Sequence, residues 1–286
     1  MRVLHTSDWH LGHALHDLPR DREHAAFLAW LLDTLDREEI DALLISGDVF
    51  DAGNPPASAL EAWYGFLAAA HRRRPHLMVV AIAGNHDSPS RLTAPAALLA
   101  GVGARVVGAV PRRPDGTVDA AALVVPLADA TGAVRAQVAA VPYLRPGDLD
   151  DQGGARADAV RELYLQVLAA ARAARAPGQA LLAMGHLHLV GGLASAASER
   201  RLGGVDVGDD GFGADIAYVA LGHLHRAQRV GVDHVRYAGS PIPLSMGEAG
   251  YAHQVVVVEL ADGALSGFRT VPVPRLIELV RLPRRG

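Results

Sequence analysis

Short apolar runs recur along the chain, and each of them is followed directly by a cluster of polar residues. Five runs have the length and the composition of buried strands, at 2–6, 42–45, 78–83, 180–184 and 218–221. Between the first two, Phe27, Leu28, Leu31, Leu32 and Leu35 recur at helical spacing and predict an amphipathic helix. We therefore expect an α/β fold in which two sheets pack face to face with helices on the outside.

Several local signals place further elements. A capping box at Ser58 to Glu61 predicts the start of a helix that runs to about Arg73. The pair Ser88-Pro89 predicts the start of another, which runs to about Ala100. Short β-like runs between 104 and 143 precede a helix at 155–175, and a hairpin turn is expected at 262–263.

The composition narrows the class of protein. Half of the 286 residues are hydrophobic and a fifth are charged, which is an ordinary globular balance. The chain has no cysteine, so disulfides and thiolate metal sites are excluded. It also lacks an apolar run of the roughly 18 residues that would span a bilayer, and its first residues do not resemble a signal peptide. We expect a cytoplasmic protein without a membrane partner.

All 27 basic residues are arginine, and the formal net charge is −4. The arginine usage is the pattern expected of a GC-rich genome, although the planar guanidinium also suits bidentate contact with phosphate. A net negative charge does not indicate nucleic-acid binding. Any affinity for DNA must therefore come from a local basic patch or from bound metal.

The polar clusters after the five strands contain side chains of the metal-binding type. These are Asp8 and His10, Asp48, Asn85 with His86, His186, and His223 with His225. Residues two positions apart lie on one face of an extended segment, so each D-x-H or H-x-H pair can point two groups at one site. Carboxylates and imidazoles without thiolates suit manganese, iron or zinc.

This pattern resembles the calcineurin-like metallophosphoesterases. Their five motifs occur here in order, as D-x-H at 8–10, G-D-x-x-D at 47–51, G-N-H-D at 84–87, G-H at 185–186 and G-H-x-H at 222–225. The stretches at 7–12, 141–146 and 239–245 are similar to those of the nuclease subunits of SbcCD-type DNA repair complexes. The resemblance implies a metallophosphoesterase fold that binds two divalent metal ions, with manganese as the expected metal.

The resemblance also implies roles for individual residues. One metal would be held by Asp8, His10 and His225, the other by Asn85, His186 and His223, with Asp48 between them. His86 would contact the phosphate and protonate the leaving oxygen, while Asp87 would orient the His86 imidazole. Asp51 would orient a ligand or a water molecule, and no substrate-binding residue is assigned.

The implied function is hydrolysis of phosphodiester bonds at DNA ends or hairpins, in partnership with DNA and an SbcC-type ATPase. Two alternatives stay open, namely a phosphodiesterase of the same fold with a small substrate, and a scaffold without catalysis. The family pairs two nuclease subunits through helices, which would involve apolar residues around 60–67 and 92–99. An ordinary core role for these residues is the other reading.

The expected domain organisation is a phosphoesterase domain at 1–270 and a linker or edge segment at 271–286. The nucleases that the sequence resembles continue into a DNA-capping domain and an ATPase-docking segment. Here the sequence stops at Gly286, close to where the cap would begin. We therefore expect a shortened form, for which stable ATPase docking and processive cutting of duplex ends are in doubt.

Overall fold

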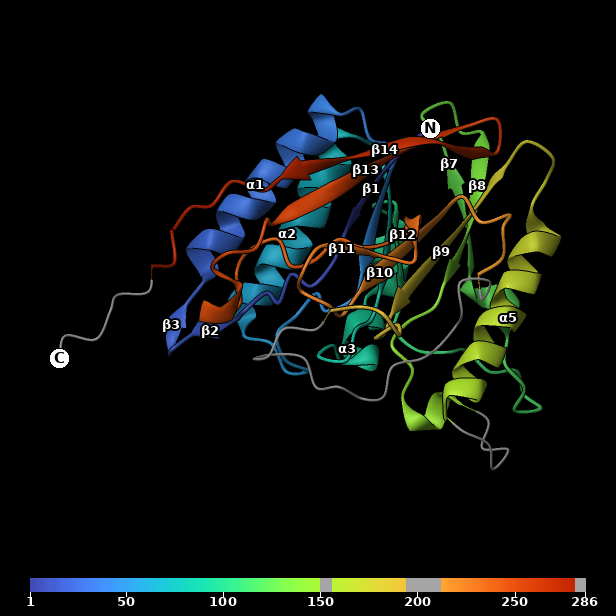
Figure 1. Ribbon diagram of the computed structural model, residues 1–286, viewed down its shortest axis with the longest axis horizontal. Coiled ribbons are helices and arrows are strands. Elements are labelled where there is room, and N and C mark those ends of the chain that lie inside the picture. Colours follow the sequence, from blue (N-terminus) through green and yellow to red (C-terminus); the bar gives the residue numbers. More distant parts are fainter. Residues whose placement is uncertain (150–155, 194–211, 281–286) are drawn as a thin grey trace.

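Two six-stranded sheets form the centre of the computed structural model, which describes residues 1–149, 156–193 and 212–280 (Figure 1). The first sheet has the order β14 (Ala264–Pro272), β13 (Gln254–Ala261), β1 (Arg2–Thr6), β4 (Ala42–Ser46), β5 (Met78–Ile82) and β6 (Ala104–Val107). The second has the order β11 (Gln228–Val230), β12 (Val232–Tyr237), β10 (Tyr218–Gly222), β9 (Ala180–His186), β8 (Val134–Ala140) and β7 (Val124–Ala128). In each sheet four neighbouring strands are parallel. Antiparallel strands extend the first sheet at one edge, as β13 and β14, and the second sheet at both edges, as β11 and β7.

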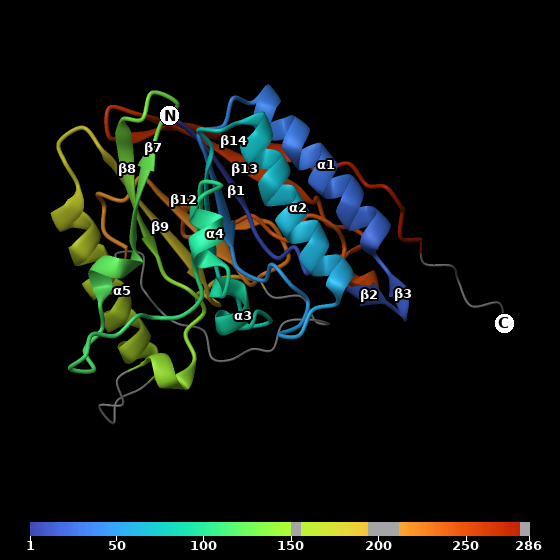
Figure 2. The same ribbon diagram turned by 180° about the vertical axis from the view of Figure 1, so that it is seen from behind.

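Helices cover both outer faces of the sheet pair. On one side α1 (Asp21–Arg37) and α2 (Ala57–Arg73) lie against the first sheet, and α5 (Arg156–Ala174) lies on the opposite side (Figures 1 and 2). The smaller elements are the hairpin β2 (Ala14–Leu15) and β3 (Leu18–Pro19), the helices α3 (Pro89–Thr93) and α4 (Ala96–Ala100), and 3₁₀ turns at Ala120–Leu123, Pro146–Asp148 and Met246–Glu248. The α/β fold with two packed sheets and outer helices is confirmed.

The side chains of β4 show why its apolar run is continuous. Ala42 and Leu44 pack into the core between the sheets, whereas Leu43 and Ile45 pack into the core beneath α1 and α2. Both faces of the strand are buried, so polar and apolar residues do not alternate along it. Successive side chains still point to opposite faces and therefore pack into different cores. The helix-side core includes a group of edge-to-face rings around Trp9, formed by Phe27, Trp63 and Phe66.

Two helix predictions need correction. The helix expected from Pro89 to about Ala100 is two short helices, because Pro95 has no backbone N–H with which to continue α3 and instead stands at the N-cap of α4. The capping box expected at Ser58 is also absent, since α2 begins at Ala57 after Pro56 and has no side-chain cap. The turn at 262–263 is confirmed, with Asp262 and Gly263 both at positive φ between β13 and β14.

Most of the apolar residues considered for pairing of two copies belong to the core. Trp63, Leu67, Leu92 and Leu99 are buried, whereas Leu98 is 78% exposed. In the last part of the described chain, β14 continues to Pro272, two residues beyond the boundary expected at 270, and residues 281–286 lie outside the described part. Among the described helices, none combines the length and the apolar character needed to cross a bilayer.

Candidate metal centre

Interlocked loops form the edge where the carboxyl ends of the parallel strands meet. Three glycines make this approach possible, because a Cβ atom added to each would collide with a neighbouring loop. At Gly47 it would lie 2.2 Å from the His186 ring, at Gly84 2.1 Å from Asp48 Oδ1, and at Gly222 1.8 Å from the carbonyl oxygen of Ser46. The glycines of the motifs therefore bring the loops of β4, β5, β9 and β10 into direct contact.

Four of the polar residues on these loops have left-handed backbone conformations. The φ angles are 55° at Asp8, 48° at His10, 50° at Asp48 and 100° at His223. Such residues cost on the order of 1–3 kcal/mol each and persist where the surroundings determine them. Here the compensation includes hydrogen bonds from the Asp8 amide to the Gly47 carbonyl (3.0 Å), from the His10 amide to the Asp48 carbonyl (3.0 Å), and from the His223 amide to Asp8 Oδ1 (2.9 Å).

The seven residues expected to hold metal lie together, in two groups around Asp48. Nε2 of His10 and Nε2 of His186 lie 3.5 and 3.3 Å from Asp48 Oδ2. Asp8, His10 and His225 each place one ligand atom within 4.8 Å of the others'. On the other side, Asn85 Oδ1 lies 3.0 Å from both His186 Nε2 and His223 Nδ1.

The donor set fits divalent metal ions. Within the described part of the chain, Asp8 Oδ2 and His10 Nε2 are buried and have no hydrogen-bond partner, an arrangement that is costly unless a cation satisfies these atoms. Carboxylate, imidazole and amide oxygen or nitrogen ligands without sulfur suit manganese, iron or zinc rather than softer metals. The two groups could each hold one ion, with Asp48 shared between them.

Three of the histidine rings are oriented by contacts of their Nδ1 atoms. Nδ1 of His10 lies 3.1 Å from Asp51 Oδ1, which is the orienting contact expected for Asp51. Nδ1 of His186 lies 2.8 Å from the Ser46 carbonyl oxygen, and Nδ1 of His225 lies 3.1 Å from Glu248 Oε1. In each case Nε2 is left to face the centre. Glu248 was not found by the sequence reasoning.

The electrostatics of the protein without metal reflect this crowding. Burial alone would raise the pKa of Asp48, but the neighbouring His186 and His10 hold that pKa far below its ordinary value. Burial would likewise lower the pKa of His186, yet Asp48 raises it to about 9. For His223, burial and the charge of His186 lower the pKa to about 3. In the protein without metal, the charge of Asp48 is thus balanced by His186, at the place where we expect metal ions to supply the positive charge.

His86 lies beside the metal groups, with its ring held by the backbone. Its Nδ1 atom donates to the carbonyl oxygen of Asp51 (2.8 Å), and its backbone amide donates to Asp48 Oδ1 (2.9 Å). The ring is edge-on to that of His10, with centroids 4.8 Å apart. With Nδ1 engaged in this way, Nε2 is the atom available to a substrate.

The expectation that Asp87 orients the His86 imidazole is wrong. The Asp87 carboxylate instead accepts hydrogen bonds from the backbone amides of Val49 (3.2 Å), Phe50 (2.9 Å) and Gly84 (2.8 Å). Burial raises the pKa of Asp87 to about 6, and the charge of Asp48 adds to that effect. Asp87 therefore joins the loop after β4 to the loop after β5, and the contact with His86 is made by the Asp51 carbonyl.

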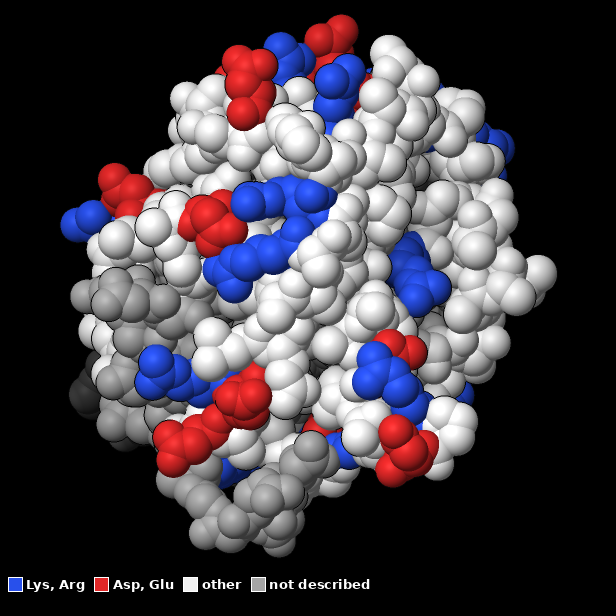
Figure 3. Space-filling model, turned by 90° about the vertical axis from the view of Figure 1, so that its right-hand side faces the viewer, with Lys and Arg blue, Asp and Glu red and all other residues white. Residues whose placement is uncertain are grey.

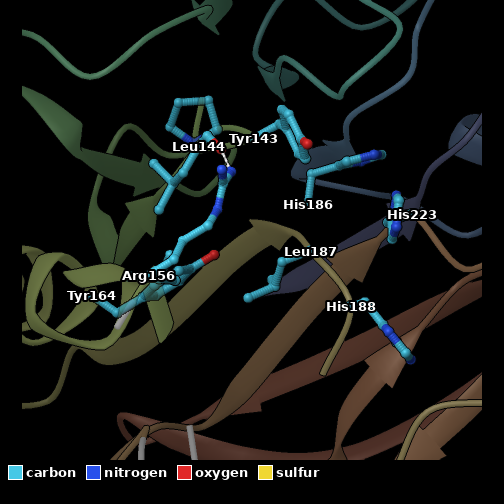
Figure 4. Close-up of a pocket in the computed structure, with 10 residues that line it drawn as sticks. Tyr143, Leu144, Arg156, Tyr164, His186, Leu187, His188 and His223 are labelled. Carbon is cyan, nitrogen blue, oxygen red and sulfur yellow. Dashed lines mark hydrogen bonds between the residues drawn. The ribbon is translucent and has the colours of Figure 1, made fainter. Parts of the chain in front are cut away.

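A pocket adjoins the centre on the side of His186 and His223 (Figure 4). Tyr143 places its ring edge-on to His186, with centroids 6.1 Å apart, and Arg156 donates to the Leu144 carbonyl at the far side. His188 points away from this group and lies 3.3 Å from the Gly192 carbonyl oxygen.

Comparison with known proteins agrees with the fold. The family model for calcineurin-like phosphoesterases matches residues 1–227. The chain belongs to this family, and it is a metal-dependent phosphodiesterase of the nuclease class.

Within the family, the chain is similar to several nuclease subunits. The D subunit of nuclease SbcCD from Rhodobacter capsulatus is 45% identical over 100% of this chain and 72% of the relative. The corresponding subunit from Escherichia coli K12 is 37% identical over 96% of this chain and 68% of its own length. That from Bacillus subtilis is 36% identical, with 92% and 67% covered.

Proposed function

We propose that this chain hydrolyses phosphodiester bonds at DNA ends or hairpins, with two manganese ions, as the nuclease subunit of an SbcCD-type complex that includes an SbcC-type ATPase. The observation that supports a two-metal site most strongly is the position of Asp48, whose Oδ2 lies 3.5 Å from His10 Nε2 and 3.3 Å from His186 Nε2. A carboxylate between two sets of ligands can bridge two cations. The relatives are named as subunits of a nuclease, SbcCD, which supports a nucleic-acid substrate and a partner subunit.

In this proposal the ligands divide as the two groups suggest. Asp8, His10 and His225 hold one ion, Asn85, His186 and His223 hold the other, and Asp48 contributes to both. Two ions held there would supply Lewis-acid polarisation of the phosphate and of the attacking water molecule. The close approach of the loops at the three glycines and the hydrogen bonds to the histidine Nδ1 atoms keep the protein ligands in place. Little reorganisation is therefore needed when substrate binds.

His86 is proposed as the residue that contacts the phosphate and protonates the leaving oxygen. Its Nδ1–H is fixed on the Asp51 carbonyl, so Nε2 can carry or release the transferred proton. Asp87 keeps the loop after β5 in register with the loop after β4 through three backbone hydrogen bonds. We assign it no contact with the reacting atoms.

Surface charge supports a central role for the metals in attracting DNA. On the face that carries α5, basic and acidic side chains interleave, and Figure 3 shows no broad basic area there. Arg172 in α5 and Arg175, just after this helix, both pair with Asp215. Two divalent ions facing Asp8 and Asp48 would leave the centre with positive charge, which attracts a phosphodiester even in an acidic protein.

The proposal is tested by cleavage assays with and without Mn²⁺. We expect manganese-dependent cutting of supercoiled plasmid, of end-labelled duplex and of a DNA hairpin, with little turnover of a small phosphodiester such as bis(4-nitrophenyl) phosphate. Asp8→Ala should remove the DNA activity, since Asp8 is a proposed ligand and its Oδ2 atom is buried without a hydrogen-bond partner among the described residues. Turnover confined to the small phosphodiester, or DNA cutting that survives both EDTA and Asp8→Ala, would contradict the proposal.

A further inference from the structure

The buried carboxylate of Glu248 contacts His225. Glu248 lies beyond the residues that the family model matches. Glu248 ends the 3₁₀ turn Met246–Glu248, and its side chain is fully buried. Oε1 lies 3.1 Å from His225 Nδ1 and accepts from the Ser245 hydroxyl (3.1 Å). Oε2 accepts from the Leu244 amide (2.8 Å) and from the Ser240 hydroxyl (3.5 Å).

These four contacts satisfy both oxygens of the buried carboxylate. Burial of an isolated carboxylate is costly in free energy, so this one requires its hydrogen-bond partners. A second contact joins the same segments, since the Ser240 amide donates to the His225 carbonyl (3.1 Å).

The hydrogen bond decides which nitrogen of His225 is available. With the proton on Nδ1 and directed at Glu248, the lone pair of Nε2 faces Asp8 and His10, the residues with which His225 groups. A carboxylate behind a metal-binding imidazole fixes the tautomer and makes the ligand nitrogen more basic. The Asp51–His10 pair supports the neighbouring ligand in the same way.

We propose that Glu248 is a positioning residue of the metal centre, which holds His225 in its Nδ1–H tautomer and thereby sets the affinity for the ion shared by Asp8, His10 and His225. The inference rests on the proposed function only in requiring that these residues bind metal. It assigns to the loop at 240–248 a role in metal retention in addition to its packing.

The chain offers a matched control for a purely structural role. Glu23 is also a buried glutamate, and it pairs with Arg20, which in turn donates to the carbonyl oxygen of Pro243 (2.8 Å). This pair therefore holds the same loop through a separate contact. No described hydrogen bond or ion pair of Glu23 reaches a proposed metal ligand. Loss of loop packing should follow from changing either glutamate, but loss of metal affinity should follow only from changing Glu248.

The test is titration of the metal-free protein with Mn²⁺ by calorimetry, for wild type, Glu248→Gln and Glu23→Gln. We expect Glu248→Gln to weaken binding of one metal equivalent by about 10–100-fold while the other equivalent is unchanged. Glu23→Gln should lower the melting temperature of the metal-free protein and leave the isotherm as in wild type. Nitrogen-15 NMR of the histidine rings in the metal-free protein should show the Nδ1–H tautomer of His225 in wild type and its loss in Glu248→Gln.

Each outcome separates this inference from the proposed function. A wild-type protein that binds no Mn²⁺ would contradict the proposed function itself. A wild type that binds two ions, together with a Glu248→Gln isotherm identical to it, would overturn only the role of Glu248. Equal weakening by Glu248→Gln and Glu23→Gln would also overturn it. If Glu248→Gln does not fold without metal, Glu248→Asp replaces it, because the shorter carboxylate keeps the charge but moves away from Nδ1, and wild-type affinity would again overturn the role.

Discussion

The backbone carbonyl of Asp51 accepts the Nδ1–H of His86 at 2.8 Å, while Oδ1 of the same residue lies 3.1 Å from Nδ1 of His10. One residue therefore fixes the orientation of a proposed ligand and of the proposed acid. The ring of His13 adds to this contact, with Nδ1 3.0 Å from Asp51 Oδ1 and Nε2 2.9 Å from the Leu244 carbonyl oxygen. The position of His86 relative to the metals is thus a property of the loop at 47–51.

Removal of the His86 ring should separate chemistry from metal binding. His86→Ala should lower kcat for DNA cleavage by about 10²–10⁴-fold, because a positioned acid is lost. The metal content should stay as in wild type, because His86 is not one of the seven proposed ligands, although one of its ring nitrogens lies within 4.8 Å of ligand atoms of His10 and Asp48. The measurements are single-turnover cleavage and metal content by mass spectrometry. A variant that keeps its hydrolysis would show that the role is misassigned.

Asp87→Asn should affect stability more than chemistry. The amide has only one acceptor oxygen and presents an NH₂ group to amides that now donate to the carboxylate, so the metal-free protein should lose about 1–3 kcal/mol in its free energy of unfolding. Urea denaturation measures this loss. At a temperature where the variant is folded, kcat should stay within about tenfold of wild type. A fall in kcat as large as that of His86→Ala, with unchanged stability, would restore a catalytic role to Asp87.

The close approach of the loops can be tested with two glycines. In Gly222→Ala the new Cβ would lie 1.8 Å from the Ser46 carbonyl oxygen, so we expect a loss of about 3 kcal/mol or more in the free energy of unfolding. Gly65 lies on the exposed side of α2 with no atom within 4 Å of an added Cβ, and Gly65→Ala should stabilise by about 0.5–1 kcal/mol. Thermal melts of both variants provide the comparison. Similar small effects at both positions would contradict the interlocked arrangement.

Much of the fold and of the site could be predicted because the information is local. The strand β4 is recognised from five consecutive apolar or small residues. Asp48 follows it by two residues, so the end of the strand determines where Asp48 lies. The contacts of Asp87 and Glu248 could not be predicted in this way. Glu248 meets His225, 23 residues earlier, only because the segment at 240–248 folds back beneath the loop after β10, and no sequence spacing encodes that path. The break between α3 and α4 differs from these contacts, because Pro95 is a local signal against a continuous helix and makes the break predictable from the sequence.

Acid should destabilise the metal-free protein partly through His5. Burial lowers the pKa of His5 from 6.5 to about 3 in the folded state, where the ring bonds Tyr218 and the Leu221 carbonyl. Between these values the unfolded chain binds a proton that the folded protein does not, so stability falls as the pH falls, by up to about 1.4 kcal/mol per pH unit for this group.

The His5→Gln variant isolates this contribution. It should be less stable than wild type at neutral pH, because the contacts of the ring are lost, but its stability should fall less steeply between about pH 6 and about pH 4. The other buried histidines with lowered pKa values, His24, His223 and His253, are present in both proteins and cancel in the comparison. Urea titrations in EDTA give both slopes, and parallel slopes would show that His5 is not held neutral.

The central claim is that seven side chains from five loops enclose a pair of cations around Asp48. Crystals soaked in Mn²⁺ and measured at the manganese absorption edge test it directly. We expect two anomalous peaks about 3.5–4 Å apart, one among Asp8, His10 and His225 and the other among Asn85, His186 and His223, with Asp48 reaching both. A single peak at full occupancy, or no peak between these residues, would contradict the two-metal account.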